Sequence, residues 1–129
     1  MTGYRADLLY PELSYQIVGI LFDVYNQLGH GFSEKTYQKA IATALKGSNL
    51  KYSEQVYAPI LYHGVKIATN YFDFLIDEKI VLEIKKGNHF AKSHIDQLYE
   101  YLKNQKLKLG ILAYFAPRNV HFKRIVNLY

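Results

Sequence analysis

Apolar side chains recur at helical spacing through the first third of the chain. Four of them lie three or four residues apart: Ile17, Leu21, Val24 and Leu28. This spacing predicts a helix over residues 13–28, which the glycines of Gly29-His30-Gly31 end. A second helix is predicted from Ser33, a candidate N-cap, to about Lys46, because Gly47 follows as a stop.

Beyond the second helix the pattern takes the period of β-strands. Residues 54–61, rich in Val, Tyr and Ile, predict a strand, and Pro59 within it favours the edge of a sheet. Residues 65–76 and 80–85 predict two further strands, joined by a tight turn at residues 77–79. The centre of the chain is therefore expected to form strands that include one tight hairpin.

The last third of the chain returns to a helical pattern before it ends in strands. Residues 92–104 show an amphipathic helical pattern, and two strands are predicted over residues 109–114 and 120–126. The order α-α-β-β-β-α-β-β indicates an α/β sandwich with a mixed sheet. A length of 129 residues suits one domain, so residues 1–129 are interpreted as a single domain.

Composition excludes several classes of protein. Hydrophobic residues make up 50% of the chain and charged residues 21%, which favours a folded core and argues against a disordered chain. The chain has no cysteine, so disulfides and thiolate metal sites are excluded. No signal peptide is apparent and no apolar run is long enough to span a bilayer, so we expect a soluble, cytoplasmic protein without a membrane partner.

The formal net charge of +5 is concentrated in the second half of the chain. Residues 1–64 carry five basic and five acidic side chains, whereas residues 65–129 carry eleven basic and six acidic ones. A basic half suits a polyanionic partner such as nucleic acid. A lysine-rich solvated surface would give the same count, so charge alone leaves both interpretations open.

The chemical signal that stands out lies in the predicted hairpin. Strand alternation is expected to place three residues on one face and three on the other: Phe72, Phe74 and Ile76 against Tyr71, Asp73 and Leu75. A loop at residues 77–79 places Asp73 opposite Glu83, so their Cβ atoms should lie about 5 Å apart. Lys85, two residues beyond Glu83, points to the same side of the sheet.

Two paired carboxylates repel each other unless a positive charge lies between them. A hard divalent cation prefers oxygen ligands and keeps bound waters, which suits Asp73 and Glu83. The Lys85 ammonium could then orient or activate a metal-bound water, or stabilise the transition state. The alternative is a solvated outer face on which Glu83 and Lys85 simply form an ion pair.

A third carboxylate lies on the second predicted helix. Glu34, in the first turn, shares a stripe with the apolar residues of that helix: Tyr37, Ile41 and Leu45. An acidic residue on a core-facing stripe could reach the sheet as a third metal ligand. At a helix N-terminus it could equally complement the helix dipole, so both interpretations stay open.

The helix predicted over residues 92–104 has a polar face beside its apolar one. Gln97 and Tyr101 are i, i+4 neighbours there, with His94 on the same face, and could hold a phosphate or a substrate nucleotide. An ordinary polar flank would give the same pattern. Three other histidines show no metal-ligand spacing and are interpreted as surface or turn residues: His63, His89 and His121.

The segment Gly31-Phe-Ser-Glu34-Lys-Thr-Tyr37 is a G-x-x-E-x-x-Y motif. It resembles that of the GxxExxY family, a small-protein branch of the PD-(D/E)XK nuclease superfamily. The resemblance runs from about Ile17 to Val126 and includes five further segments: Leu28-Gly29-His30-Gly31, Asp73-Phe-Leu-Ile, Val81-Leu-Glu83-Ile-Lys85, Gln97-Leu-Tyr-Glu-Tyr101-Leu and Leu109-Gly110-Ile-Leu. The fold that this resemblance implies is a restriction-endonuclease-like α/β sandwich, in which helices flank a mixed sheet.

The resemblance also implies a role for each matching residue. Asp73 corresponds to the central metal ligand, with the Ile84 backbone carbonyl as an extra ligand. Glu83 and Lys85 correspond to the (D/E)-x-K pair, and Glu34 to the helix-borne acidic residue of the superfamily's first motif. Two residues are similar to the Q-x-x-x-Y motif of RecB-type nucleases: Gln97 and Tyr101.

These roles imply a nuclease that uses Mg²⁺ or Mn²⁺ to hydrolyse phosphodiester bonds in nucleic acid, DNA rather than RNA. Catalysis would rest on four residues: Glu34, Asp73, Glu83 and Lys85. The alternative is a nucleic-acid-binding module that keeps the nuclease fold but catalyses little or nothing. A third hypothesis is a partner-binding protein with an incidental acidic site. A domain this small could also form a homodimer to hold a duplex.

Overall fold

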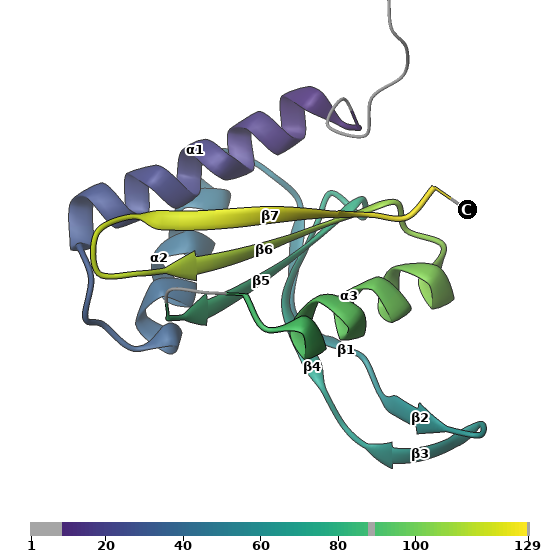
Figure 1. Ribbon diagram of the computed structural model, residues 1–129. Helices are drawn as coiled ribbons and strands as arrows, with labels where there is room; N and C mark the ends of the chain where they lie inside the picture. Colours follow the sequence, from purple (N-terminus) through teal and green to yellow (C-terminus); the bar gives the residue numbers. More distant parts are fainter. Residues whose placement is uncertain (1–8, 88–89, 129) are drawn as a thin grey trace, which may run out of the picture.

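The computed structural model describes residues 9–87 and 90–128 (Figure 1). Three helices occur in this part of the chain: α1 (Pro11–Leu28), α2 (Glu34–Gly47) and α3 (Lys92–Gln105). The strands there are β1 (Tyr52–Tyr57), β2 (Ile60–Tyr62), β3 (Val65–Ala68), β4 (Tyr71–Ile76), β5 (Ile80–Lys86), β6 (Leu109–Phe115) and β7 (Val120–Val126). No helix in these described ranges is long and apolar enough to cross a membrane.

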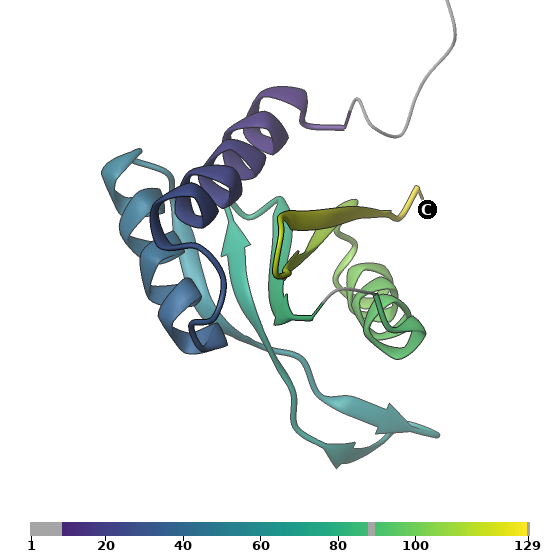
Figure 2. The ribbon, with the colours of Figure 1, turned by 60° about the vertical axis from the view of Figure 1, so that its left-hand side comes forward.

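Five of the strands form one mixed sheet in the order β1-β4-β5-β6-β7. The β5 and β6 strands run parallel, whereas the other neighbouring pairs are antiparallel. The α1 and α2 helices cover one face and α3 covers the other, as Figure 2 shows. The predicted α/β fold, a mixed sheet flanked by helices, is therefore confirmed.

The helices form where the sequence supplies a start signal and an apolar stripe. Pro11 opens α1, because its fixed φ suits the first helical turn and it has no N–H to leave unpaired. Ser33 caps α2, and its hydroxyl oxygen accepts a hydrogen bond from the Thr36 N–H at 3.2 Å. The buried stripe of α2 is the predicted one: Tyr37, Ile41 and Leu45. This burial fixes the direction in which the polar residues of α2 point.

Two hydrophobic cores lie on opposite faces of the sheet. The α1–α2 core joins those helices to side chains of the central strands, such as Phe74 and Ile84. The α3 core joins the third helix to the other face, with Leu98 of the helix packed near Val81 of the sheet. The β5 and β6 strands supply both cores and are buried over nearly their whole length, so they form a firm base for the side chains at their ends.

The prediction of one strand over residues 54–61 and one over residues 65–76 is wrong, because each segment holds two strands. The chain leaves the five-stranded sheet at Ala58, whose N–H donates to the Asn70 carbonyl oxygen at 2.7 Å. Pro59 has no N–H and cannot extend the ladder. The segment between forms a separate hairpin of β2 and β3, which projects from the body of the protein in Figure 1.

The faces predicted for β4 also need a correction. Phe74 and Ile76 share the α1–α2 core, but Phe72 lies in the α3 core on the opposite face. Regular alternation of the side chains fails at Asp73. There the ladder between β4 and β5 has ended, and the ladder between β4 and β1 skips Gln55, which has a φ of 54°. The β4 strand therefore twists at Asp73, and this twist is part of the candidate site.

Candidate active site

The candidate site lies where the ladder between β4 and β5 stops. Three residue pairs join these strands: Phe74–Leu82, Leu75–Val81 and Ile76–Ile80. This is the register that a turn at residues 77–79 sets, so the predicted pairing is confirmed over these positions. Asp73 and Glu83 occupy the next position along the two strands, beyond the last pair.

At this position two carboxylates replace the hydrogen bonds that the strands no longer make with each other. Glu83 Oε1 accepts the Asp73 N–H at 3.1 Å, and Asp73 Oδ2 accepts the Ile84 N–H at 2.7 Å. Asp73 and Glu83, the carboxylate pair, are each only 8% exposed. The two acids expected to face each other are therefore held together by backbone hydrogen bonds that fix their orientation.

Two further side chains contact the carboxylate pair. Lys85 Nζ lies 3.4 Å from Glu83 Oε2, so the lysine does point to the same side as Glu83. From α2, Gln38 Nε2 donates to Asp73 Oδ1 at 2.8 Å. Sequence periodicity did not single out Gln38. Its i, i+4 spacing from Glu34, which places both on one face of the helix, was the available signal.

Burial and mutual repulsion shift the pKa of both acids upward. Burial raises the pKa of Glu83 to about 8, and the charge of Asp73 adds to the rise. Burial also raises the pKa of Asp73, against the lowering effect of the hydrogen bond from the Ile84 N–H. One Lys85 ammonium serves two carboxylates, so at neutral pH the site favours either a proton on Glu83 or an added cation.

The donor chemistry of the carboxylate pair suits a hard divalent cation. Mg²⁺ is commonly bound by one or two carboxylates, while waters and substrate phosphates fill its other positions. An added cation would also offset the repulsion that raises the pKa of Glu83. Within residues 9–87 and 90–128, no three Asp, Glu, His or Cys side chains gather closely enough to hold a metal ion. The residues present therefore fit a metal as a two-carboxylate site.

Glu34 reaches the same end of the sheet but is not in contact with the carboxylate pair. Its Oε2 accepts the Lys86 N–H at 2.9 Å, which ties the start of α2 to the end of β5. From this position the negative charge of Glu34 contributes to raising the pKa of Asp73. The structure thus brings the expected third ligand close to the site, with its carboxylate hydrogen-bonded to the neighbouring strand.

Gln97 and Tyr101 lie on α3, across the sheet from α2. The Tyr101 ring packs against Phe72, with the ring centres 5.1 Å apart, and burial raises the pKa of the Tyr101 hydroxyl. In the part of the chain that the structure describes, neither side chain has a hydrogen bond to the carboxylate pair. Their role in holding substrate therefore stays a prediction.

His94 shares that face of α3 and lies nearer to the charges of the site. Its Nδ1 is 2.8 Å from the Tyr114 hydroxyl oxygen, within hydrogen-bonding distance. Burial lowers the pKa of the His94 imidazole, and the positive charge of Lys85 lowers it further, so a neutral ring is favoured. The spacing of His94 from Gln97 and Tyr101 was visible in the sequence, but it assigned no role to this histidine.

Two of the three histidines expected at surface or turn positions, His63 and His121, lie away from this site. His63 lies in the turn between β2 and β3, where its ring contacts that of Tyr62 with the centres 4.3 Å apart. His121 is exposed on β7, and His89 lies outside the described residues.

Comparison with known proteins gives the family of the chain. The crystal structure of SSO0001 is similar over 89% of this chain and 77% of that chain, with 19% identity and a TM-score of 0.49. An alkaline exonuclease (LHK-Exo) from Laribacter hongkongensis is similar over 88% of this chain and 82% of that chain, with 12% identity and a TM-score of 0.46. No curated protein matches. The family model of the PD-(D/E)XK nuclease superfamily matches residues 11–125, which is most of the chain. The protein therefore belongs to this superfamily.

Proposed function

We propose that this protein is a divalent-metal-dependent nuclease that hydrolyses phosphodiester bonds, in DNA rather than RNA. The observation that carries the proposal is the carboxylate pair with Lys85 beside it, at the open end of a hairpin ladder. Acids whose pKa is strongly perturbed cluster at functional sites, and the pKa of Glu83 is raised to about 8. Membership of the nuclease superfamily supports the reaction class.

Each residue of the site has its own task in this proposal. Asp73 and Glu83 bind Mg²⁺ or Mn²⁺, together with the Ile84 backbone carbonyl. The ion, when bound, supplies positive charge that polarises the phosphate and lowers the pKa of water. Lys85 holds the attacking oxygen in place and balances the negative charge of the phosphate. Gln38 positions Asp73 through the hydrogen bond of 2.8 Å from its amide.

Other residues assist from outside the pair. Glu34, whose charge already acts on Asp73, adds a third acidic group to the surroundings of the ion. Gln97 and Tyr101 contact the substrate, and the basic residues of the second half of the chain contact phosphates. Membership of the GxxExxY branch, a cytoplasmic location and a homodimer that holds a duplex belong to the same proposal and stay predictions.

Cleavage assays on labelled DNA and RNA of one sequence test the proposal. We expect DNA cleavage with Mg²⁺ or Mn²⁺ and none with EDTA. Asp73→Asn should lower the rate by about a thousandfold or more, because it removes one of the two carboxylate ligands. Glu78→Gln is the matched control, since it neutralises an exposed carboxylate at the other end of the same hairpin. Equal rates in Asp73→Asn and wild type would overturn the mechanism.

A nucleic-acid-binding module without catalysis is the second candidate. One observation favours it, because all four carboxylate oxygens of the pair already have a hydrogen-bond or ion-pair partner within the protein. Such a module should bind DNA equally well in Mg²⁺ and in EDTA, with an affinity that falls steeply with salt. Binding of that kind without any cleavage of DNA or RNA would favour the module over the nuclease.

A further inference from the structure

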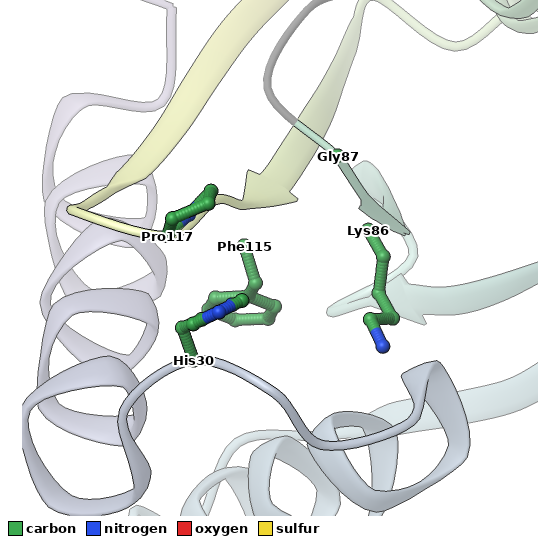
Figure 3. A pocket seen from close by; sticks show the side chains of 5 residues that line it. All are labelled: His30, Lys86, Gly87, Phe115 and Pro117. Atoms are coloured by element: carbon green, nitrogen blue, oxygen red, sulfur yellow. The ribbon is translucent and has the colours of Figure 1, made fainter.

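A pocket of about 390 Å³ lies at the end of β5, where three segments of the chain meet. Five residues line it: His30, Lys86, Gly87, Phe115 and Pro117. Figure 3 shows Lys86 on one side of the pocket and His30 with Pro117 on the other. Sites for single small molecules commonly measure about 300–1,000 Å³, so a pocket of this size suits one nucleotide and is too small for a duplex.

Aromatic side chains hold the apolar wall of the pocket from behind. Phe115 stacks with Tyr37 at 4.2 Å between ring centres and with Tyr25 at 6.1 Å. The hydroxyl of Tyr37 donates to the Gly29 carbonyl oxygen at 2.5 Å, and that of Tyr25 donates to the Ala116 carbonyl oxygen at 2.7 Å. The same two tyrosines therefore support the Phe115 ring and anchor the loops on either side of it, which makes the pocket preformed.

The G-x-x-E-x-x-Y motif directly follows His30 and holds the segments that line this pocket in place. Gly31 has a φ of 110°, a conformation that favours glycine, so the chain can turn directly after His30. Glu34 binds the Lys86 N–H at 2.9 Å, and Tyr37 holds the loop at Gly29. Each named residue of the motif thus helps to hold a segment that lines the pocket, a task that a metal-ligand role for Glu34 alone would not explain.

Two polar side chains line the pocket, those of Lys86 and His30. In the described ranges, the Lys86 ammonium and the His30 imidazole have neither a hydrogen bond nor an ion pair. Among the other exposed lysines of the described ranges, Lys79, Lys92 and Lys103 each form an ion pair with a carboxylate, whereas Lys108 forms none. An unpaired ammonium and an imidazole beside an apolar wall can bind a phosphate that carries an apolar group.

The pocket and the carboxylate pair are connected through β5. Lys85 and Lys86 are consecutive in this strand, so their side chains leave opposite faces. Lys85 contacts Glu83, whereas Lys86 lines the pocket. Glu34 binds the backbone between the two locations. A polynucleotide strand that crosses the end of β5 would therefore place neighbouring nucleotides at the carboxylate pair and at the pocket.

We infer that the pocket is a nucleotide subsite for the strand that is cleaved. Lys86 and His30 bind the phosphate of the nucleotide next to the scissile bond, and the exposed Pro117 contacts its sugar and base, with the buried Phe115 ring supporting this wall from below. The inference rests on the proposed nuclease function for its place in catalysis. Binding of a mononucleotide to the pocket requires neither a metal nor cleavage, so it can be measured separately.

Titration with dAMP in EDTA, followed by NMR, tests the subsite. We expect chemical-shift changes at the backbone amides of residues 29–31, 86–87 and 115–116. Lys86→Ala should weaken binding about tenfold, the loss expected for one charge-assisted hydrogen bond, and Lys86→Arg should restore most of it. Lys108→Ala is the matched control, since it removes an exposed lysine at the opposite end of β6.

Three results would overturn the subsite. They are an absence of shifts in the pocket at millimolar dAMP, an unchanged affinity in Lys86→Ala, and an equal affinity for dAMP and inorganic phosphate. The last result would mean that the apolar wall of the pocket at Pro117 contributes nothing to recognition. Lys86-dependent binding of dAMP would support the subsite even in a protein that cleaves nothing, so failure of the subsite and failure of the nuclease proposal are distinguishable.

Discussion

The hairpin of β4 and β5 carries charged side chains at both of its ends, in opposite surroundings. At the turn, Lys51 lies 2.6 Å from Glu78 and Lys79 lies 3.2 Å from Asp77, and these side chains face solvent. At the other end, the carboxylate pair is buried and has Lys85 as its cation. The same two strands thus hold acids that water solvates and acids from which water is largely excluded.

The direction of the pKa shifts separates the two ends. A hydrogen bond from Lys51 lowers the pKa of Glu78, which is the ordinary effect of an opposite charge. Burial raises the pKa of Glu83 to about 8 instead. A carboxyl group whose pKa is lowered by folding stabilises the fold at neutral pH. A carboxyl group whose pKa is raised by folding destabilises it there, and such groups are often retained for function. This contrast singles out the buried end as the candidate site.

The largest expected difference between the ends is in catalysis. Lys85→Ala should lower the rate of DNA cleavage by about 100- to 1,000-fold, because it removes the ammonium beside the carboxylate pair. Lys79→Ala removes a lysine from the turn and should leave the rate within about twofold. Single-turnover cleavage of a labelled duplex measures both rates. Equal rates in the two variants would show that Lys85 takes no part in the chemistry.

The pairing that creates this contrast could be predicted from the sequence. A tight turn at residues 77–79 decides which residues face each other, because a slip of one position would turn every side chain to the other face. Asp73 and Glu83 could therefore be placed together from spacing alone, and Lys85 with them. The apolar stripe of α2 likewise directed Glu34 toward the sheet.

The twist at Asp73 and its contact with Gln38 could not be predicted in that way. Strand alternation assumes a regular pleat, and nothing in the sequence marks Gln55 for the left-handed conformation at which the pairing of β1 with β4 omits one position. Pro59 was interpreted as a mark of the sheet edge, whereas in the structure it lies between two strands, because it has no N–H with which to extend the ladder. The hydrogen bond from Gln38 to Asp73 depends on how α2 packs against the sheet, and periodicity within one element carries no such information.

The second largest difference should be in the pH dependence of stability. The unfolded chain ionises Glu83 near its ordinary pKa of 4.5, whereas the folded protein keeps that proton up to about pH 8. The folded state therefore binds more protons in this window, and the free energy of unfolding should fall as the pH rises from about 4.5 to about 8. Glu83→Gln has no proton to lose, so it should flatten the slope and raise the Tm near pH 8 by about 5 °C or more.

Thermal unfolding across this pH window, followed by circular dichroism, measures the slope. Asp73 contributes in the same direction, because burial raises the pKa of this acid too. Glu78→Gln is the control with the opposite sign. The pKa of Glu78 is lowered in the folded protein, so its carboxylate stabilises the fold above pH 4.5, the ordinary pKa of a glutamate. This contribution is lost as the pH falls through the lowered pKa. A wild-type Tm that rises steadily toward pH 8 would contradict the burial argument.

A smaller effect is expected when divalent metal is added to the folded protein. Mg²⁺ bound by the carboxylate pair should stabilise the fold by about 1.4 kcal/mol at ten times its Kd. The rise in Tm should grow as the pH approaches the raised pKa of Glu83, about 8, because the ion competes with that proton. Scanning fluorimetry should show no rise in Asp73→Asn and an unchanged rise in Glu78→Gln. A full rise in Asp73→Asn would place the ion elsewhere.

The smallest effect should come from the turn end of the hairpin. The Lys51 and Glu78 side chains are 68% and 71% exposed, so water and salt screen their attraction. Glu78→Gln should therefore change the Tm by less than about 2 °C at neutral pH, and about 1 M salt should abolish the change. Thermal unfolding of both proteins in low and high salt makes the comparison. A Tm shift as large as that of Glu83→Gln, and one that persists in high salt, would contradict this contrast. It would mean that burial does not make the electrostatics of the carboxylate pair different from those of the turn.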